Sequence, residues 1–247
     1  MTFYGDYHTH TRYSDGKNSI EENVAAAVSK GLKEIAVTDH GFRNMFCLKI
    51  SDIQKQKKEI DACRIKYPNI KILHGIEADL VGTDGRIDLT REQFGLFDLV
   101  IAGYHPSARP YTLADMYGIH LKTYFSVVFK PTKEIIRQNT RAAIKMLERY
   151  KIDIYPHINH SFYVDIKEVA KVCADTGTYM ELNAKHLDAE ICKALFESDA
   201  RLVANTDAHS SYNVGAFGGI ESFITENGFD INRIENLKKG IELSGRI

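Results

Sequence analysis

The sequence predicts a single α/β domain built on a parallel sheet, and it favours a closed barrel over an open sheet. Seven short apolar segments, typical of buried strands, alternate with amphipathic segments that are typical of helices. The segments are evenly spaced, and the chain lacks the glycine-rich phosphate loop of an open nucleotide-binding sheet. No linker rich in proline, glycine or serine divides the chain, so we expect one domain over residues 1–247.

The first half of the chain contains four of the expected strands. The first strand is expected at residues 3–8, and the helix "NSIEENVAAAVSKG" follows it. Ser19 and Glu22 have the spacing of a capping box at its start, and Gly31 occupies the position of a helix stop. The strand "LKEIAVTDH", a polar helix through residues 51–66, and the strands "IKILHGIEADL" and "FDLVIAGYH" complete this half.

The second half begins with an aromatic-rich segment, residues 108–131, which we expect to be a loop. It could form a lid or pocket wall over the substrate, or a contact between two subunits. A helix over residues 132–150, the strand "KIDIYPHIN" and a helix capped by Asp165 and ended by Gly177 follow. The strand "TYMELNA", a short helix capped by Asp188, the strand "RLVANTDAH" and an amphipathic helix "DINRIENLKKGIEL" complete the chain.

Composition and charge restrict the class of protein. The chain is 44% hydrophobic and 26% charged, which is ordinary for a globular enzyme. Its net charge of -1 counts against a protein that binds nucleic-acid phosphates, which usually has a basic excess. The four cysteines are far apart and form no CxxC pair, as expected for reduced thiols in a cytoplasmic protein. No signal peptide or membrane helix is expected.

Histidine and acidic residues stand at the expected carboxyl end of almost every strand. In "DYHTHTRYSDG" two histidines are one residue apart, so both imidazoles can point to the same face of a strand. The strand-end residues are His8, His10, Asp39, His40, Glu77, His105, His157, Asp207 and His209. Because strand ends converge on one face of an α/β barrel, these side chains predict a metal centre there.

The number and type of these side chains indicate the kind of metal centre. Nine groups exceed the three or four ligands of one zinc ion, so they suit two or three ions bridged by carboxylates. Imidazole with carboxylate favours zinc, manganese or iron, and the absence of clustered cysteine argues against a soft-metal site. Multinuclear centres of this kind activate water and stabilise the in-line displacement of a phosphoryl group.

The ordered motifs "DYHTHTRYSDG", "AVTDHG", "GIEADL", "AGYH" and "NTDAH" resemble those of the PHP family, named for polymerase and histidinol phosphatase. The resemblance covers nearly the whole chain and is greatest to the small stand-alone bacterial phosphatases. It implies a distorted seven-stranded β/α barrel that holds three divalent ions, with zinc expected and manganese or iron as alternatives.

The resemblance also implies how the ligands are shared. The implied sets are His8, His10, Glu77 and Asp207 for the first metal, Glu77, His105 and His157 for the second, and Asp15, His40 and His209 for the third. Glu77 would therefore bridge two ions. Asp15 departs from the similar small phosphatases, which have a histidine near this position. An aspartate there could weaken the third site or shift its preference toward manganese or iron.

These features together predict a metal-dependent phosphomonoesterase that acts on a small phosphorylated metabolite, with histidinol phosphate as one candidate. A metal-bridging hydroxide would attack phosphorus, and Asp207 or His209 would pass a proton to the leaving alcohol. Arg12 and Arg43 follow metal motifs directly and are the candidate phosphate ligands. The alternatives are a phosphodiesterase or 3'-5' exonuclease acting on nucleotides, and a non-catalytic module stabilised by metal. A homo-oligomer is compatible with the sequence.

Several other polar residues have two interpretations. Asp6 and Asp39 neighbour metal-binding motifs, so each either accepts a proton from an imidazole or serves as a solvated or capping residue. His74 precedes Glu77 by three residues and is interpreted as a core residue or as a support for the ligands, with metal ligation as the alternative. His160 follows His157 closely and is expected to be structural or to face the substrate.

Overall fold

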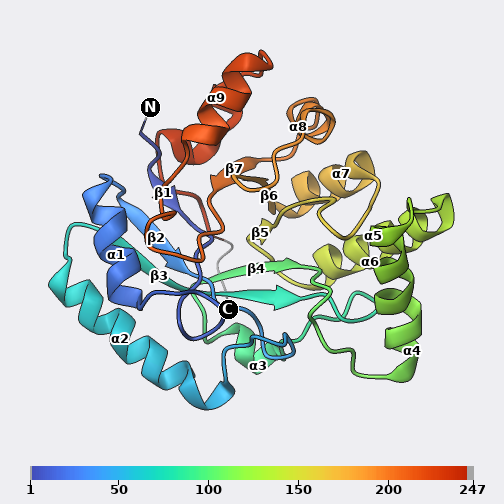
Figure 1. The fold of residues 1–247 in the computed structure, drawn as a ribbon, viewed down its shortest axis with the longest axis horizontal. Helices are drawn as coiled ribbons and strands as arrows, with labels where there is room; N and C mark the ends of the chain where they lie inside the picture. The colour runs from blue at the N-terminus through green and yellow to red at the C-terminus, as the bar shows by residue number, and fades with distance from the viewer. Residues whose placement is uncertain (1, 244–247) are drawn as a thin grey trace.

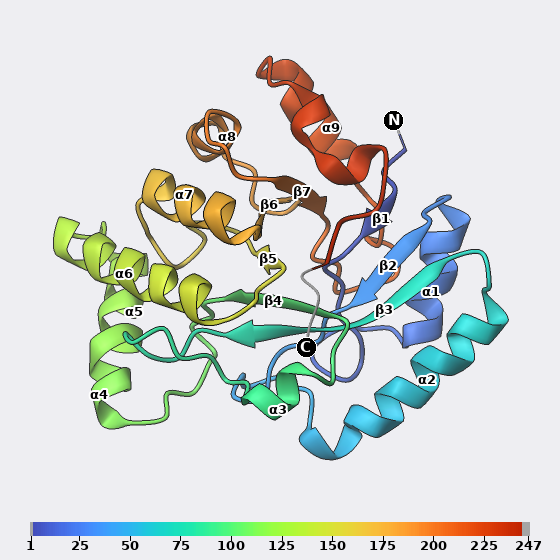
Figure 2. The same ribbon diagram turned by 180° about the vertical axis from the view of Figure 1, so that it is seen from behind.

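Seven parallel strands form one sheet in which each strand pairs with the next along the chain. The computed structural model describes residues 2–243, apart from the side chains of residues 126–128. The strands are β1 (Gly5–Asp6), β2 (Glu34–Val37), β3 (Lys71–Asp79), β4 (Leu99–Gly103), β5 (Ile154–Tyr155), β6 (Tyr179–Asn183) and β7 (Leu202–Asn205). Figures 1 and 2 show the helices arranged around the outside of these strands. The expected α/β barrel is confirmed.

The helices are α1 (Ile20–Ser29), α2 (Ile53–Lys66), α3 (Arg91–Phe94), α4 (Leu113–Asp115), α5 (Lys122–Val128), α6 (Lys133–Arg149), α7 (Ile166–Thr176), α8 (Ala189–Phe196) and α9 (Gly218–Glu226). Five helices, α1, α2, α6, α7 and α8, correspond to helices that the sequence predicts. Short turns of 3₁₀ helix occupy Ile50–Asp52, Ile231–Arg233 and Glu235–Leu237, and Met116–Leu121 forms a π-helix. Within the described chain, no helix is both long enough and apolar enough to cross a membrane.

Local capping signals explain where the predicted helices begin and end. The Ser19 side chain accepts the Glu22 backbone N–H while the Glu22 carboxylate accepts the Ser19 N–H, so the predicted capping box is present. Asp165 caps α7, and Gly177 ends it at a φ of 75°, a conformation that glycine adopts without strain. Asp188 caps α8 in the same way as Asp165 caps α7.

Two hydrophobic cores support the barrel. The inner core takes residues from every strand or its immediate end, together with one residue of the C-terminal segment: Tyr7, Ala36, Leu73, Leu99, Ile101, Ile154, Tyr179, Val203 and, from that segment, Ile241. The larger outer core lies between the strands and the helices that cover them. Because apolar side chains fill the barrel, the strands are fixed in position, and polar side chains that follow their carboxyl ends are held rigidly.

The barrel closes irregularly between β1 and β7. One bridge joins Thr9 to Ala208, and the buried side chain of Asn236 spans the gap elsewhere. Its Nδ2 donates to the carbonyls of Gly5 and Ala204, at 2.9 and 2.7 Å, and its Oδ1 accepts the Ala204 N–H at 2.9 Å. An amide side chain therefore replaces part of the strand pairing at this seam.

The structure corrects several sequence expectations about where helices and strands lie. The segment 230–243 does not form an amphipathic helix, because Asn236 must enter the seam, and only two 3₁₀ turns remain. The helix of this region is α9, which starts at Gly218 and Gly219, residues with low helix propensity. Strands β1 and β5 are also shorter than expected, with two residues each.

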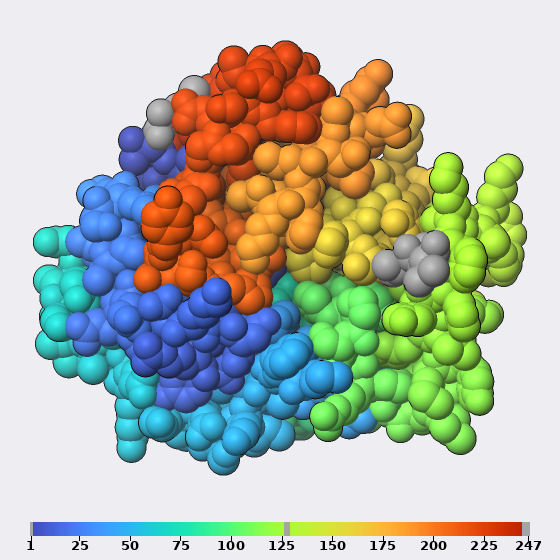
Figure 3. All heavy atoms as spheres, viewed as in Figure 1, coloured from blue at the N-terminus to red at the C-terminus, as the bar shows by residue number. Residues whose placement is uncertain are grey.

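The aromatic-rich segment 108–131 is largely helical instead of the expected loop. It contains α4, the π-helix and α5, with a complete capping box between Thr112 and Asp115. Figure 3 shows this green segment at one edge of the molecule. Several of its aromatic side chains are exposed, among them Tyr117, Tyr124 and Phe129.

Candidate metal centre

The barrel brings the nine predicted metal ligands together. His8 and His10 follow β1, His40 follows β2, Glu77 lies in β3, His105 follows β4, His157 follows β5, and Asp207 and His209 follow β7, while Asp15 lies in the loop before α1. A parallel bridge between His40 and Glu77 and the bridge beside His8 and His10 fix neighbouring strand ends against each other. Their convergence agrees with the sequence analysis, and their assignment as ligands stays a prediction.

Glu77 occupies the middle of this group. Its carboxylate is buried, and each of its oxygens faces imidazole nitrogens at 3.1–3.4 Å. The imidazoles belong to His8, His105 and His157 at Oε1, and to His10 and His40 at Oε2. A carboxylate with ligand nitrogens around both oxygens is suited to bridging two ions.

Three overlapping groups of residues could each hold an ion. In each group one ligand atom per residue lies within 4.8 Å of the others. The groups are His10, Asp15, His40 and His209; His8, His10 and Asp207; and His40, Glu77 and His105. His157 lies next to the last group, because its Nε2 is 3.2 Å from Nε2 of His105. His10 and His40 thus each stand between two groups, which differs from the division implied by the family resemblance.

Unpaired buried atoms indicate that this arrangement fits metal ions. Among the described residues, His8 Nε2, both ring nitrogens of His10, His40 Nδ1 and Glu77 Oε2 are buried without a hydrogen-bond partner. Leaving buried polar atoms unpaired costs free energy, so such atoms rarely gather without a reason. Divalent cations between them would satisfy lone pairs on nitrogen and oxygen together, which is what a mixed imidazole and carboxylate donor set provides.

Electrostatics keep the carboxylates of the centre ionised. Burial raises the pKa of Glu77, but the nearby imidazoles of His8 and His105 outweigh it and lower that pKa well below its usual range. Asp207 behaves similarly, with His8 and His10 lowering its pKa. Burial lowers the pKa of His10 to about 3, so this ring stays neutral and can coordinate a cation.

Two residues at the centre have strained backbones. His157 and Asp207 have φ values of 25° and 49°, in the left-handed region that non-glycine residues rarely adopt. Such strain persists only where the surroundings enforce it, and it concentrates at functional sites. At both positions it accompanies a side chain that reaches the group of candidate metal ligands.

Two carboxylates behind the imidazoles were missed by sequence reasoning. Glu181 Oε1 lies 2.8 Å from Nδ1 of His8, and Asp79 Oδ1 lies 2.6 Å from Nδ1 of His105. The other oxygen of Glu181 accepts the backbone N–H of His157. Carboxylates in this position orient a ligating histidine and fix its tautomer. An isolated acid in the apolar strand "YMELN" was the available signal for Glu181.

The two aspartates considered for this role have other partners. Asp6 accepts hydrogen bonds from Thr206 and from the Gly215 backbone, and Asp39 accepts them from Thr11, Ser14 and Gln56. Both are buried, so neither is the solvated residue of the alternative interpretation. They organise the loops that follow the strands.

His74 and the remaining histidines lie outside the ligand groups. His74 is buried against Phe97, and its Nε2 lies 2.8 Å from the Gln56 side-chain oxygen. It is therefore a core residue. His160 and His186 stack on each other with ring centroids 3.5 Å apart, and both rings lie within about 6.5 Å of His157.

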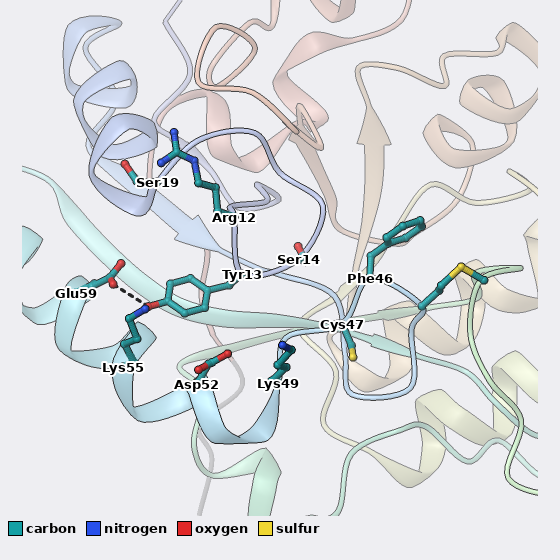
Figure 4. Close-up of a pocket in the computed structure, with 11 residues that line it drawn as sticks. Arg12, Tyr13, Ser14, Ser19, Phe46, Cys47, Lys49, Asp52, Lys55 and Glu59 are labelled. Atoms are coloured by element: carbon teal, nitrogen blue, oxygen red, sulfur yellow. Dashed lines mark hydrogen bonds between the residues drawn. The ribbon is translucent and has the colours of Figure 1, made fainter.

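Neither predicted phosphate-binding arginine contacts the nine candidate ligands in the described chain. The Arg12 Nε donates to the Lys17 carbonyl, and the side chain lines a hollow of about 580 Å³ beside the loop before α1 (Figure 4). Arg43 donates to the carbonyls of Arg109 and Pro110. Its guanidinium also lies 4.1 Å from the centroid of the Tyr111 ring.

A lysine contacts the centre instead. Lys185 Nζ lies 3.3 Å from Asp207 Oδ2 and 2.8 Å from His209 Nδ1. Sequence reasoning missed this residue, although it follows the polar end of β6 by two positions.

Comparison with known proteins places this geometry in a family. The PHP domain model matches residues 6–185. A probable phosphatase of Shewanella halifaxensis is 27% identical over 256 residues, which cover 96% of this chain and 89% of the relative. The DNA polymerase/3'-5' exonuclease PolX of Bacillus subtilis is 29% identical over 219 residues. That match covers 83% of this chain but only 34% of the polymerase.

The fold has a solved counterpart. The histidinol phosphate phosphatase of Lactococcus lactis, solved with zinc, L-histidinol and phosphate, aligns with a TM-score of 0.62 at 19% identity. The alignment covers 93% of this chain and 95% of that structure. The chain therefore belongs to the PHP domain family, and it is a metal-dependent phosphoesterase of that family.

Proposed function

We propose that the protein is a phosphomonoesterase that uses three divalent ions, with zinc as the expected metal, to hydrolyse a small phosphorylated metabolite. The observation that carries this proposal is the buried Glu77 carboxylate with imidazole nitrogens around both oxygens. The zinc, L-histidinol and phosphate bound by the Lactococcus structure support histidinol phosphate as the first substrate to test.

We propose that all nine converging side chains are ligands and that Glu77 is shared between ions. Asp15 supports a third ion, because its carboxylate lies 3.2 Å from His209 Nε2 and 3.6 Å from His40 Nε2. His10 and His40 each belong to two of the geometric groups, whereas the family resemblance assigns each of them to one ion. Either assignment is compatible with the proposal. A single aspartate at position 15 makes this third site the weakest of the three in our proposal.

Each part of the centre then has a chemical task. Bound divalent ions would lower the pKa of a coordinated water and neutralise charge on the phosphoryl group. Glu181 and Asp79 hold His8 and His105 in the orientation that ligation requires. Buried apolar neighbours exclude bulk water from the inner side of the centre, which strengthens these electrostatic interactions.

We propose Asp207 or His209 as the group that passes a proton to the leaving alcohol. Asp207 Oδ1 and His209 Nδ1 are 3.3 Å apart, so a proton could move between them. The His209 side chain is 30% exposed, whereas that of His8 is fully buried. A leaving alcohol that departs toward solvent would meet His209 first.

Arg12 remains a proposed substrate contact because its exposed guanidinium lines the hollow beside the loop before α1. Arg43 is a weaker proposal. Its guanidinium would first have to leave the carbonyls of Arg109 and Pro110 and the ring of Tyr111.

One comparison favours a second function. The match to the PolX polymerase supports 3'-5' exonuclease or phosphodiesterase activity as the alternative. The near-neutral net charge counts against it, because single-stranded substrates are usually held in a positively charged groove. A non-catalytic, metal-stabilised binding module is the third possibility.

The experiment that tests the proposal is phosphate release by protein stripped of metal and reloaded separately with zinc, manganese or iron. The panel contains histidinol phosphate, other small monoesters, mononucleotides and a labelled single-stranded DNA. We expect metal-dependent release from monoesters. Release of mononucleotides from DNA without monoester hydrolysis would establish the alternative, and metal binding without any hydrolysis would support the binding module.

A further inference from the structure

Lys185 is held in place by the turn that follows β6. Its backbone N–H donates to Asn183 Oδ1 at 2.9 Å, which closes a tight turn of the Asx type. Asn183 Nδ2 in turn donates to Glu181 Oε2 at 2.9 Å. The same carboxylate that orients His8 therefore also anchors the turn that carries Lys185.

The hydrogen positions at His209 determine which contacts Lys185 can keep. His209 Nδ1 has two neighbours, the Asp207 carbonyl at 2.9 Å and Lys185 Nζ at 2.8 Å. A carbonyl only accepts a hydrogen bond and an ammonium only donates one, so Nδ1 can satisfy one of them but not both. The contact of Lys185 that does not depend on His209 is the one to the Asp207 carboxylate.

When Nδ1 donates to the Asp207 carbonyl, Lys185 has no hydrogen bond to the imidazole. It keeps the carboxylate of Asp207 as a partner, at 3.3 Å from Oδ2. An ammonium has three N–H donors, so two remain for another acceptor. The side chain is 35% exposed, which leaves these donors accessible at the rim of the metal cluster.

We propose that Lys185 binds a phosphoryl oxygen of the substrate, next to Asp207 and His209. This inference rests on the proposed phosphoesterase function and names the positively charged residue that recognises the phosphate. A lysine ammonium forms a short, charge-assisted hydrogen bond with phosphate and acts as a point charge. The sequence-based candidates Arg12 and Arg43 donate to backbone carbonyls elsewhere, so Lys185 and neither arginine is the basic side chain placed beside Asp207 and His209.

The test measures binding of inorganic phosphate to metal-loaded protein by calorimetry, together with metal content and steady-state kinetics. The variant is Lys185→Met, with Lys185→Arg as the conservative replacement. Lys193→Met on α8 is the matched control, because its side chain is 67% exposed and pairs only loosely with Glu197 at 3.9 Å.

We expect Lys185→Met to weaken phosphate binding and raise KM roughly 10-fold to 100-fold, the effect of one charged hydrogen bond. Its metal content should match the wild type, Lys185→Arg should recover part of the binding, and Lys193→Met should resemble the wild type. Unchanged phosphate binding in Lys185→Met, or loss of metal from it, would overturn the inference. Lysine-dependent phosphate binding by a protein that hydrolyses no monoester would support the inference and overturn the proposed function alone.

Discussion

Glu181 holds His8 from behind, with its Oε1 2.8 Å from Nδ1, while Nε2 of the same ring lies 3.1 Å from Glu77. The ring is thus fixed between two buried carboxylates, one inside the proposed metal cluster and one outside it. Glu181 also accepts hydrogen bonds from Asn183, Asn205 and the backbone of His157. Its position links three strand ends, so it affects the geometry of the centre without reaching an ion.

Replacing Glu181 by glutamine should weaken metal binding roughly 10-fold to 100-fold, as expected when a supporting carboxylate is neutralised. Glutamine preserves the size of the side chain but removes the charge that raises the basicity of His8. The measurement is zinc or manganese affinity by chelator competition. Glu226→Gln, on the exposed end of α9, is the control. Equal affinities in both variants would show that Glu181 only stabilises the fold.

Replacing Glu77 by glutamine should impair catalysis strongly. An amide cannot supply two anionic oxygens to neighbouring ions, so we expect a fall in kcat/KM of at least about 100-fold, the scale of a misplaced reacting group. Metal content measured by mass spectrometry should fall in the same variant. Full metal occupancy together with wild-type activity would contradict the central position we assign to this carboxylate.

Removing metal should destabilise the protein, because ligands that bind only the folded chain stabilise it. An ion present at 1,000 times its dissociation constant contributes about 4 kcal/mol. For a chain of this size that corresponds to a rise in Tm of roughly 8–16 °C. Thermal unfolding with and without chelator measures the effect, and Glu77→Gln should show a smaller difference. A chelator that leaves Tm unchanged would exclude an ion bound at the centre.

The pKa of His74 leads to a prediction of how the free energy of unfolding depends on pH. Burial lowers its pKa to about 4 from the ordinary value of 6.5, so the folded state binds this proton less readily than the unfolded state. The contribution of neutral His74 to the free energy of unfolding is therefore fully present above pH 6.5 and is lost as the pH falls toward 4. The shift corresponds to about 3 kcal/mol over this interval.

His74→Gln should make that loss smaller, since glutamine does not titrate. The measurement is the free energy of unfolding in urea at pH 7 and pH 4.5, in the wild type and the variant. Histidines of the metal centre titrate equally in both proteins, so the comparison isolates position 74. Parallel pH profiles would show that His74 is protonated with little cost in the folded state.

Local signals account for most of what the sequence could predict. The capping residues Ser19, Asp165 and Asp188 mark helix starts because each cap involves neighbours within three residues. The metal motifs were recognisable because strand ends in a barrel converge whatever the sequence between them. The expected convergence at Glu77 needed no knowledge of side-chain conformations.

Residues that act through distant partners were not predictable in the same way. Glu181 meets His8 from a strand 173 residues away, and nothing near either residue reveals the pairing. Lys185 resembles any other lysine until the turn at Asn183 directs it toward Asp207. The C-terminal segment has the apolar spacing of a helix, yet Asn236 must enter the seam of the barrel, and tertiary contacts override that local preference.

Asn236 gives the last prediction, which concerns closure of the barrel. Its amide satisfies the carbonyls of Gly5 and Ala204 and the N–H of Ala204, all of them buried in the seam. Asn236→Ala would leave these groups unpaired, and each unsatisfied buried group costs about 1–3 kcal/mol. We therefore expect a loss of at least about 2 kcal/mol in the free energy of unfolding, measured in urea. Asn227→Ala, at the exposed end of α9, should cost far less. Equal losses in the two variants would mean that the seam is held by the bridge between Thr9 and Ala208, without help from the amide.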